Sequence, residues 1–388
     1  MFRNLLVIGF TLLLMAVSLE IGLRIWGYSD RNFYAFDSQV GKVLRPGISG
    51  WQTKEGNAFV EINSHGQRDI KHSKEKAPEV IRIAVLGDSY AQASQVPLEQ
   101  SFWKVAESHL NNGCKNAGEN RFEFINFGVD AYGTAQEYLM LRHKAWDFKP
   151  DLVLVAFTSG NDVRNNSREL EGDPLRPYFI LEDGELKLDD SFKNTTAHEV
   201  GTSRTGKLIY GLFDNIRLLQ LANEARKGWR VRQAQNEDDE GEDRLVELGL
   251  AEEVFKEPKT AAWKAAWEVT DALIARIVED SAEEDARTLV MVVSHSLQVH
   301  PDSRLRNDIQ RKLGVEDLYY TDRRVVSVAR NAGAVGFMTA PALLDWAETN
   351  GECVHGFKNA GACSGHWNAV GHRIAGELLG KNICASLE

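Results

Sequence analysis

Four short polar segments of the sequence carry side chains that together could cleave an ester. Acyl transfer through a covalent intermediate needs a nucleophilic oxygen, a base that takes its proton, and hydrogen-bond donors for the oxyanion. A serine, a histidine and an asparagine in these segments could fill those roles. The segments are Gly87-Asp88-Ser89-Tyr90, residues 126–134 (NFGVDAYGT), Ser159-Gly160-Asn161-Asp162, and His366-Trp367-Asn368 with Gly371-His372.

Ser89 is the candidate nucleophile. It follows the apolar run 81–86 (IRIAVL), and Gly87 allows a tight backbone there, so the hydroxyl could project from the end of a strand. Taken alone, such a serine could also be a turn or helix-cap residue. The Gly-x-Ser-x-Gly elbow of α/β-hydrolases is absent, because residue 91 is alanine, and that fold is therefore disfavoured.

The elements that position these segments alternate between strands and helices. Right-handed crossovers would then give a parallel sheet with helices on both faces. In such sheets ligands bind beyond the carboxyl ends of the strands, where Ser89 and Asn161 fall. Apolar, β-branched runs predict strands at 81–86, 122–127, 152–157 and 288–293, and helical patterns lie at 99–110, 136–146, 207–230 and 260–281.

In order, spacing and placement after strands, the four segments resemble the SGNH (GDSL-like) hydrolase family over residues 80–379, apart from a helical insertion. Residues 63–69 (NSHGQRD) also resemble the lead-in of membrane-anchored bacterial members. The resemblance implies a three-layer α/β/α domain with a flavodoxin-like parallel sheet and no cofactor. It also implies a serine esterase or acyltransferase acting on acyl, typically O-acetyl, esters of an extracytoplasmic glycan or lipid.

The same resemblance assigns roles to individual residues. Ser89 would be the nucleophile and His366 the base, with His372 structural near the start of the C-terminal helix. The oxyanion would be held by the backbone N–H groups of Ser89 and Ala131 and by the side chain of Asn161, which could alternatively cap the next turn. The remaining site residues, expected to contact substrate or shape the turn, are Asp88, Gly128 and Trp367.

Two positions depart from the family pattern. Ala131 stands where the family has glycine, and the family's aspartate two or three residues before the catalytic histidine is replaced by Ser364 or Cys363. The acceptor for His366 is then expected to be a backbone carbonyl or a carboxylate from elsewhere, such as Asp345. A Ser–His dyad can still work, with weaker orientation of the imidazole. These departures support a rival function, a catalytically weak glycan-binding or complex-assembly protein.

The N-terminus predicts export. Arg3 precedes an uncharged apolar run at 5–19, and apolar character resumes as far as residue 26. About 20 apolar residues suffice to span a bilayer, and Arg3 would stay in the cytoplasm. We expect residues 1–27 to be an uncleaved anchor that exposes the rest on the extracytoplasmic side. A signal peptide cleaved after Ser18 and a buried core helix are the alternatives.

Beyond the anchor we expect two further units. Residues 28–79 would be an extended lead-in and residues 80–388 the SGNH-type domain, with a helical insertion at about 165–287. Within the insertion, the charge run 236–244 (NEDDEGEDR) is expected to be a solvated or disordered loop.

The cysteines fit an exported chain. Cys353 and Cys363 lie ten residues apart in a Gly-rich loop and are expected to form a disulfide, which leaves Cys114 and Cys384. Free buried thiols are the alternative.

Composition and spacing also argue against two classes of partner. The formal net charge of −11 is unsuited to displacing phosphate counterions, so a nucleic-acid partner is not expected. No His-x-x-x-His or Cys-x-x-Cys pair appears, so no metal site is expected either. His295 and His300, after the fourth strand, would then be rim or structural residues.

Overall fold

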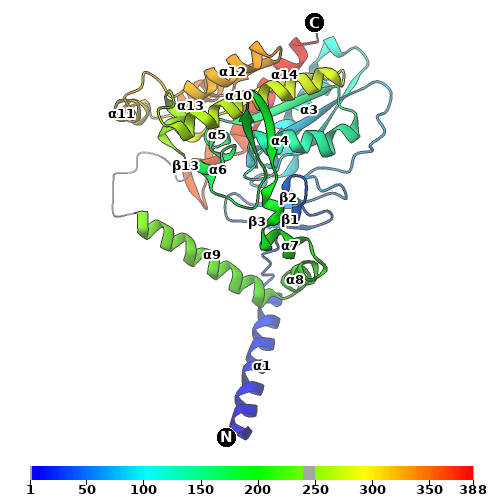
Figure 1. Ribbon diagram of the computed structural model, residues 1–388, viewed down its shortest axis with the longest axis vertical. Helices are drawn as coiled ribbons and strands as arrows, with labels where there is room; N and C mark the ends of the chain where they lie inside the picture. The colour runs from blue at the N-terminus through cyan, green and yellow to red at the C-terminus, as the bar shows by residue number, and fades with distance from the viewer. Residues whose placement is uncertain (1, 239–249, 388) are drawn as a thin grey trace.

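A five-stranded parallel sheet forms the centre of the computed structural model, which describes residues 2–238 and 250–387 (Figure 1). The strands lie in the order β11-β10-β7-β5-β6, which is the 2-1-3-4-5 order of flavodoxin-like sheets. The predicted fold class is confirmed. The strands are β5 (Val80–Gly87), β6 (Arg121–Asn126), β7 (Leu152–Thr158), β10 (Arg287–Val293) and β11 (Val335–Met338).

The sheet is buried on both faces, so each strand sends alternate side chains into two hydrophobic layers. In β7, Val153 and Val155 enter one layer, while Leu152 and Leu154 enter the other. Three layers result. Helices α4 (Thr134–Met140), α10 (Ala261–Glu283) and α12 (Tyr320–Asn331) cover the first face, and α3 (Phe102–Gly113), α13 (Ala340–Asn350) and α14 (Ala369–Ala385) cover the second.

The four predicted strands coincide with β5, β6, β7 and β10 to within one residue at each end. The sequence does not predict β11, because its four residues are too short a run to signal a buried strand. The helix expected at 207–230 is two helices, α8 (Arg204–Asn215) and α9 (Arg217–Asp238), which meet at Ile216. Helix α10, expected within the insertion, instead packs on the sheet and leads into β10.

Short hairpins and helices complete the described chain. In the lead-in, β1 (Tyr34–Asp37) pairs with β2 (Gly41–Leu44), and β3 (Ser49–Gln52) pairs with β4 (Ala58–Glu61). From residue 239 onward, the predicted charge run lies outside the described residues. The other elements are α2 (Ser89–Gln92), α5 (Asp162–Asn165), α6 (Arg168–Glu171), β8 (Tyr178–Glu182), β9 (Glu185–Asp189), α7 (Thr196–Thr202), α11 (Ser303–Leu313), β12 (His355–Phe357) and β13 (Gly361–Trp367).

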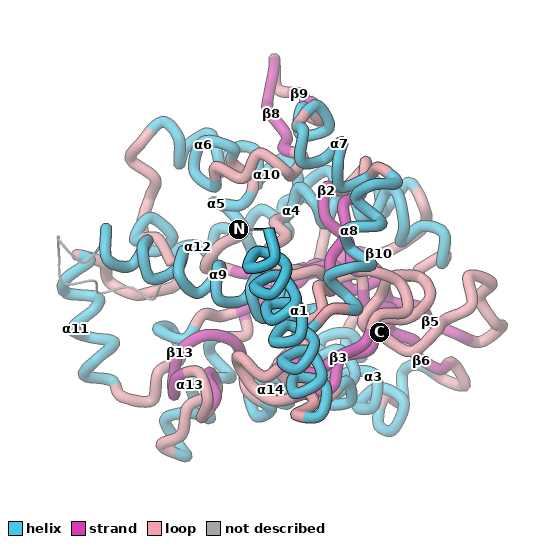
Figure 2. Tube along the Cα trace, turned by 90° about the horizontal axis from the view of Figure 1, so that it is seen from below, coloured by secondary structure: helices cyan, strands magenta, loops and turns pink. Residues whose placement is uncertain are grey.

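Helix α1 (Phe2–Ile25) projects from one end of the domain (Figures 1 and 2). It is long and apolar enough to cross a membrane, with a mean hydropathy of 2.3 over its most apolar window. None of that window is buried in the structure, so the alternative of a buried core helix is wrong.

All four cysteines are paired. The predicted disulfide between Cys353 and Cys363 is present, and a second joins Cys114 to Cys384. The second bridge ties the end of α3 to α14 across 270 residues of sequence. Free buried thiols are therefore excluded.

Candidate active site

Ser89 begins α2 directly after β5 and faces a cavity of about 340 Å³. Asp88 caps α2, and its carboxylate accepts a hydrogen bond from the Tyr90 backbone N–H at 2.9 Å. Gly87 is required by close packing, since a Cβ there would lie 2.8 Å from that of Ala91. The strand–helix turn therefore presents the Ser89 hydroxyl at the carboxyl end of the sheet.

His366 lies in β13 with its imidazole between Ser89 and an acidic side chain. Its Nε2 is 2.8 Å from Ser89 Oγ, and its Nδ1 is 2.5 Å from Glu55 Oε2. The backbone N–H of His366 also donates to Glu55 Oε1 at 2.7 Å. Of the expected acceptors, the carboxylate from elsewhere in the chain is the one present, and it is Glu55. The example named for it was wrong, because Asp345 is exposed on α13.

Glu55 reaches the site from the lead-in, in the turn between β3 and β4. Residue 365 must be glycine for this approach, because a Cβ there would lie 2.3 Å from Glu55 Oε1. Glu55 and His366 are separated by 311 residues of sequence. No spacing rule links a turn carboxylate to a histidine so far away, and the sequence gives no local signal that would have found it.

The Glu55 turn is held by the loop that the Cys353–Cys363 disulfide closes. Asn359, inside that loop, accepts a hydrogen bond from the Gly56 N–H at 3.1 Å. Its amide donates in return to the carbonyls of Thr53 and Gly56, each at 2.8 Å. The disulfide loop therefore positions the carboxylate that contacts His366.

The pair of His366 and Glu55 shifts both pKa values toward an ion pair. Burial alone would lower the pKa of His366, but the hydrogen bond to Glu55 and its charge outweigh burial and raise the pKa above its ordinary value. Burial alone would raise the pKa of Glu55, yet the hydrogen bonds from His366 hold it below the ordinary value. An ionised Glu55 favours a proton on Nδ1, which leaves Nε2 free to accept the proton of Ser89.

The predicted oxyanion donors Asn161 and Ala131 lie in segments that hydrogen-bond to α2 or to its cap. The Asn161 side chain makes no cap for the following helix and instead donates to Asp88 Oδ2 at 3.2 Å, so the capping alternative is wrong. Ala131 has a φ of 59°, in the left-handed region that favours glycine. Arg176 binds its carbonyl, and the neighbouring Asp130 N–H donates to Gln92 Oε1 at 2.7 Å. These contacts hold an alanine in the backbone conformation that suits a glycine.

Three residues expected to contact substrate are packing residues. Trp367 is completely buried, and its indole N–H donates to Ser294 Oγ at 3.2 Å. Asp88 is likewise completely buried as the cap of α2. Gly128 faces α2, and a Cβ on it would lie 2.4 Å from that of Ala91. Asp88 shapes the turn, as expected, and none of the three is among the residues that line the cavity.

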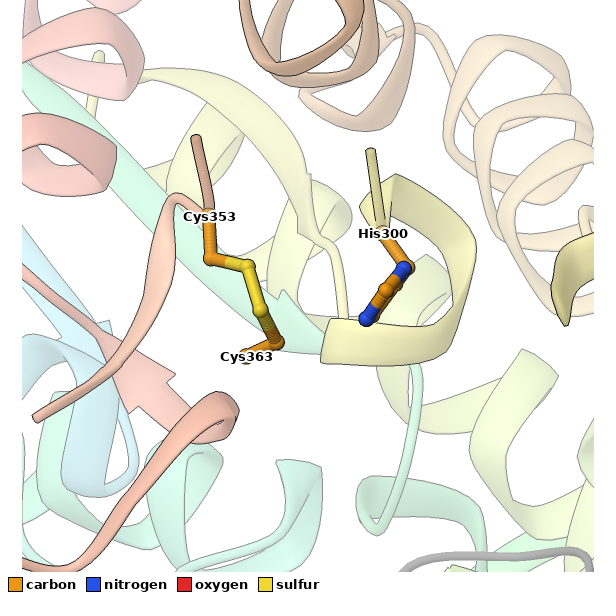
Figure 3. Close-up of side chains that lie close together, drawn as sticks. All are labelled: His300, Cys353 and Cys363. Atoms are coloured by element: carbon orange, nitrogen blue, oxygen red, sulfur yellow. A yellow bond between two sulfur atoms is a disulfide. The ribbon is translucent and has the colours of Figure 1, made fainter. Parts of the chain in front are cut away.

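The other histidines near the sheet are structural. His372 is buried beside Phe102, whose N–H donates to its Nδ1 at 3.2 Å, and burial lowers its pKa to about 3. Burial also lowers the pKa of His295 to about 3. His300 lies next to the Cys353–Cys363 disulfide (Figure 3). Both sulfurs are bonded to each other, so neither offers a thiolate to a metal ion.

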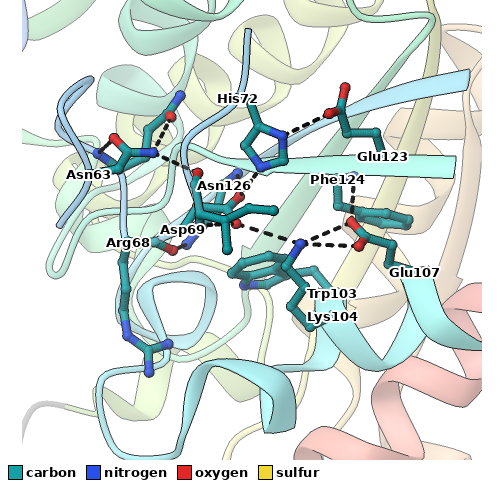
Figure 4. Close-up of polar contacts among 12 residues, drawn as sticks. Asn63, Arg68, Asp69, His72, Trp103, Lys104, Glu107, Glu123, Phe124 and Asn126 are labelled. Carbon is teal, nitrogen blue, oxygen red and sulfur yellow. Dashed lines mark hydrogen bonds and ion pairs between the residues drawn. The ribbon is translucent and has the colours of Figure 1, made fainter. Parts of the chain in front are cut away.

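A buried polar network locks the lead-in onto the sheet (Figure 4). The Arg68 guanidinium donates to the carbonyl of Gln92, the last residue of α2, at 3.0 Å. The Asp69 carboxylate accepts from the Asn126 N–H at 3.1 Å. Burial alone would lower the pKa of His72, but the carboxylates of Asp69 and Glu123 raise it to about 9. The segment that carries Glu55 is therefore part of the domain.

The cavity wall combines aromatic, charged and amide side chains. Trp51, beside Glu55 on the lead-in, is 59% exposed. Gln95 hydrogen-bonds Glu55 and helps to hold its pKa down. Besides Ser89, His366 and Glu55, the wall includes Arg31, Tyr34, Trp51, Lys54, Gln92, Gln95, Asp130 and Lys227.

No protein-family model matches the chain, and no curated protein matches it. Among solved structures, it is similar to an acetyl xylan esterase at 10% identity and a TM-score of 0.36, covering 77% of this chain and 98% of the other. It is also similar to a candidate lipolytic protein of the G-D-S-L family from Desulfitobacterium hafniense, at 11% identity and a TM-score of 0.36, covering 78% of this chain and 98% of the other. A third similar structure is a catalytic mutant of an acetylxylan esterase from Geobacillus stearothermophilus, at 10% identity and a TM-score of 0.37, covering 81% of this chain and 96% of the other.

Proposed function

We propose that this chain is an extracytoplasmic serine esterase or acyltransferase that acts on acyl esters, O-acetyl esters above all, of a glycan or lipid. The observation that carries the proposal is the hydrogen-bonded chain from Ser89 Oγ through His366 to Glu55, with separations of 2.8 and 2.5 Å. Such a chain turns a weakly nucleophilic hydroxyl into an attacking group at neutral pH.

The reaction proceeds in two acyl-transfer steps. Ser89 Oγ bonds to the acyl carbon while His366 Nε2 takes its proton, and the carbonyl π-bond opens to an oxyanion. The oxyanion collapses as the C–O bond to the alcohol breaks, and His366 returns its proton to the leaving oxygen. Water or an acceptor hydroxyl then attacks acyl-Ser89 in the same way, which regenerates the serine.

The oxyanion is held by donors at the carboxyl end of the sheet. We assign this role to the backbone N–H groups of Ser89 and Ala131 and to the Asn161 amide. Asn161 Nδ2 donates to Asp88 Oδ2 at 3.2 Å, and this contact with the residue next to Ser89 supports the assignment. Each donor of this kind contributes about 3 kcal/mol to transition-state stabilisation.

Trp51 supports a glycan substrate. Its indole is 59% exposed, lines the same cavity as Ser89, and packs edge-on against Phe59 with ring centroids 5.5 Å apart. A sugar ring has an apolar face of C–H groups that fits against such an aromatic surface, and its hydroxyls can bond to Gln92 and Asp130. An exposed aromatic pair at the mouth of a reactive cavity is suited to this contact.

The rival function, a weak binding protein of the same fold, loses one of its two supports. It rested on the missing acidic partner and on Ala131, and Glu55 now stands beside His366. A protein that only binds a glycan does not need an aligned serine, histidine and carboxylate. Hydrolysis and transfer share every step up to acyl-Ser89, so both stay within the proposal.

The proposed location on the outer side of a membrane rests on α1 and the cysteines. The apolar helix precedes the rest of the chain, and the two disulfides suit an oxidising compartment. With Arg3 on the cytoplasmic side, the catalytic cavity lies on the opposite side of the bilayer.

Active-site labelling tests the proposal. A fluorophosphonate probe should label the detergent-solubilised full chain at Ser89, and Ser89→Ala should lose both the label and turnover of nitrophenyl acetate with nearly unchanged Tm. Ser108→Ala, at an exposed serine of α3, is the matched control and should label normally. Labelling or turnover that persists in Ser89→Ala would remove Ser89 as the nucleophile.

A further inference from the structure

Helix α8 carries an apolar stripe that no described part of the chain covers. Leu208, Ile209 and Leu212 are 67%, 41% and 47% exposed, and their spacing places them on one side of the helix. Leu221, one turn into α9, is 36% exposed and continues the series. We call these four side chains the elbow patch, after the bend between α8 and α9.

The opposite side of α8 is attached to the domain. Asp214 accepts from Arg45 Nη1 at 2.9 Å, and the Arg45 guanidinium lies over the Tyr210 ring, 5.6 Å from its centroid. Gln220 donates to the Phe213 carbonyl at 2.7 Å, which braces the bend. Because the inner side makes these contacts, the apolar stripe is held outward.

The bend is bonded to the end of α1. Glu20 accepts from the N–H groups of Arg217 and Leu218 at 3.1 and 2.9 Å, and so caps the start of α9. Arg24 donates to the Asn215 carbonyl at 2.6 Å, and Leu23 is buried. In Figure 1, α8 lies beside the end of α1 where that helix enters the domain.

We propose that the elbow patch inserts into the interface of the bilayer that α1 spans. The proposal rests on the proposed anchoring by α1. A bilayer crossed by α1 ends near Glu20, because the apolar run stops at Leu19, and that level is where α8 and α9 meet. Arg204 and Lys207 are exposed on α8, as is typical of helices that lie among lipid headgroups with their apolar side inserted.

This placement bears on the catalytic cavity. Helix α9 starts at the bend and supplies Lys227 to the wall that Ser89 and His366 share. If the elbow patch inserts into the bilayer interface, only α9 separates the membrane surface from the cavity, and the cavity stays close to that surface. The second helix of the bend is a structural link between the membrane contact and the site.

Site-directed spin labelling of the full chain in nanodiscs of phosphatidylethanolamine and phosphatidylglycerol tests the proposal. All four native cysteines are in disulfides, so a single added cysteine carries the label. Leu212→Cys probes the patch, and Leu14→Cys probes the span. Leu305→Cys, 38% exposed on α11 and away from α1 in Figures 1 and 2, is the matched control.

The ratio of oxygen to nickel-chelate collisions should be several-fold higher at position 212 than at position 305, and highest at position 14. A lipid-exposed label at 14 with a water-exposed label at 212 overturns the elbow proposal and leaves the anchor intact. A water-exposed label at 14 overturns the anchor and the elbow proposal with it. If the label at 212 is shielded from both reagents, a protein covers the patch and the proposal fails. Turnover of nitrophenyl acetate, unchanged in all three variants, reports separately on the proposed activity.

Discussion

Among single residues, Glu55 has the largest influence on how the candidate nucleophile Ser89 is activated through His366. Its two carboxylate oxygens contact the ring and the backbone N–H of His366, at 2.5 and 2.7 Å. One side chain therefore fixes both the orientation of the imidazole and its tautomer. Ser364 and Cys363, the positions at which the family resemblance predicts an aspartate, contribute no acid, and a turn of the lead-in supplies the carboxylate.

Glu55→Gln should lower kcat on nitrophenyl acetate by about 10²–10⁴-fold, because an amide neither stabilises the imidazolium nor enforces a proton on Nδ1. Glu55→Asp should retain part of the activity. Glu61→Gln, an exposed carboxylate on the neighbouring strand β4, is the matched control and should behave as wild type. Wild-type kinetics in Glu55→Gln would return the site to a Ser–His dyad.

The pH–rate profile reports on the same pair. His366 must be neutral to accept a proton, so activity rises with pH through its pKa. The charge of Glu55 raises that pKa, and the acidic limb of kcat/KM should lie above the ordinary value of about 6.5. In Glu55→Gln the raising partner is lost while burial persists, so the limb should move to lower pH. An unmoved limb would show that Glu55 does not set the pKa of His366.

Two elements that are far apart in the sequence, the β3–β4 turn and the disulfide loop, together position the carboxylate of the site. The β3–β4 turn presents Glu55, and the disulfide loop presents Asn359, which bonds the turn on both sides. The network of Arg68, Asp69 and His72 then fastens the same lead-in to the sheet. These contacts make residues 28–79 part of the candidate active site, whereas the sequence suggested only a segment that leads into the domain.

Asn359→Ala should lower kcat by about 10-fold with little loss of Tm, because small misplacements of a positioning group cost one to two orders of magnitude. Lys358→Ala, at the exposed neighbouring position, is the control and should leave kcat unchanged. Reduction of the Cys353–Cys363 bridge should reproduce the loss. Equal kinetics in the two alanine variants would show that the turn holds Glu55 without help.

At the scale of the whole molecule, the main feature is how α1 is connected to the cavity. Helix α1 leaves the domain at the bend between α8 and α9, and α9 supplies a residue to the cavity wall. Helix α9 therefore connects the end of α1 to the wall of the cavity. One disulfide ties α3 to α14, and the other closes the loop before β13 that holds the Glu55 turn.

If α1 is an uncleaved anchor, the mature protein should begin at or near Met1 and stay with membranes after a carbonate wash. The apolar window of α1, with a mean hydropathy of 2.3, supplies the driving force for retention. N-terminal sequencing and fractionation are the measurements. A mature chain that starts at Leu19 would instead establish cleavage after Ser18.

The sequence by itself determined four of the five strands of the sheet and the polar residues that follow them. Continuous β-branched runs specify strands buried on both faces, and the polar residues after each run must gather at one edge of a parallel sheet. Ser89 and Asn161 follow from that rule. The spacing of Cys353 and Cys363 likewise predicts their bridge, because both cysteines lie in one short loop.

Only the tertiary structure decided which carboxylate faces His366, which residues line the cavity, and where α1 meets the domain. Glu55 is one of 56 acidic residues, and its contact with His366 spans 311 positions. Local pattern carries no information about such a pair, because it depends on how hairpins and loops dock after the sheet has formed. Trp367 is a second example. Its place next to His366 in the sequence suggested contact with substrate, but at the end of β13 its side chain is buried in the core.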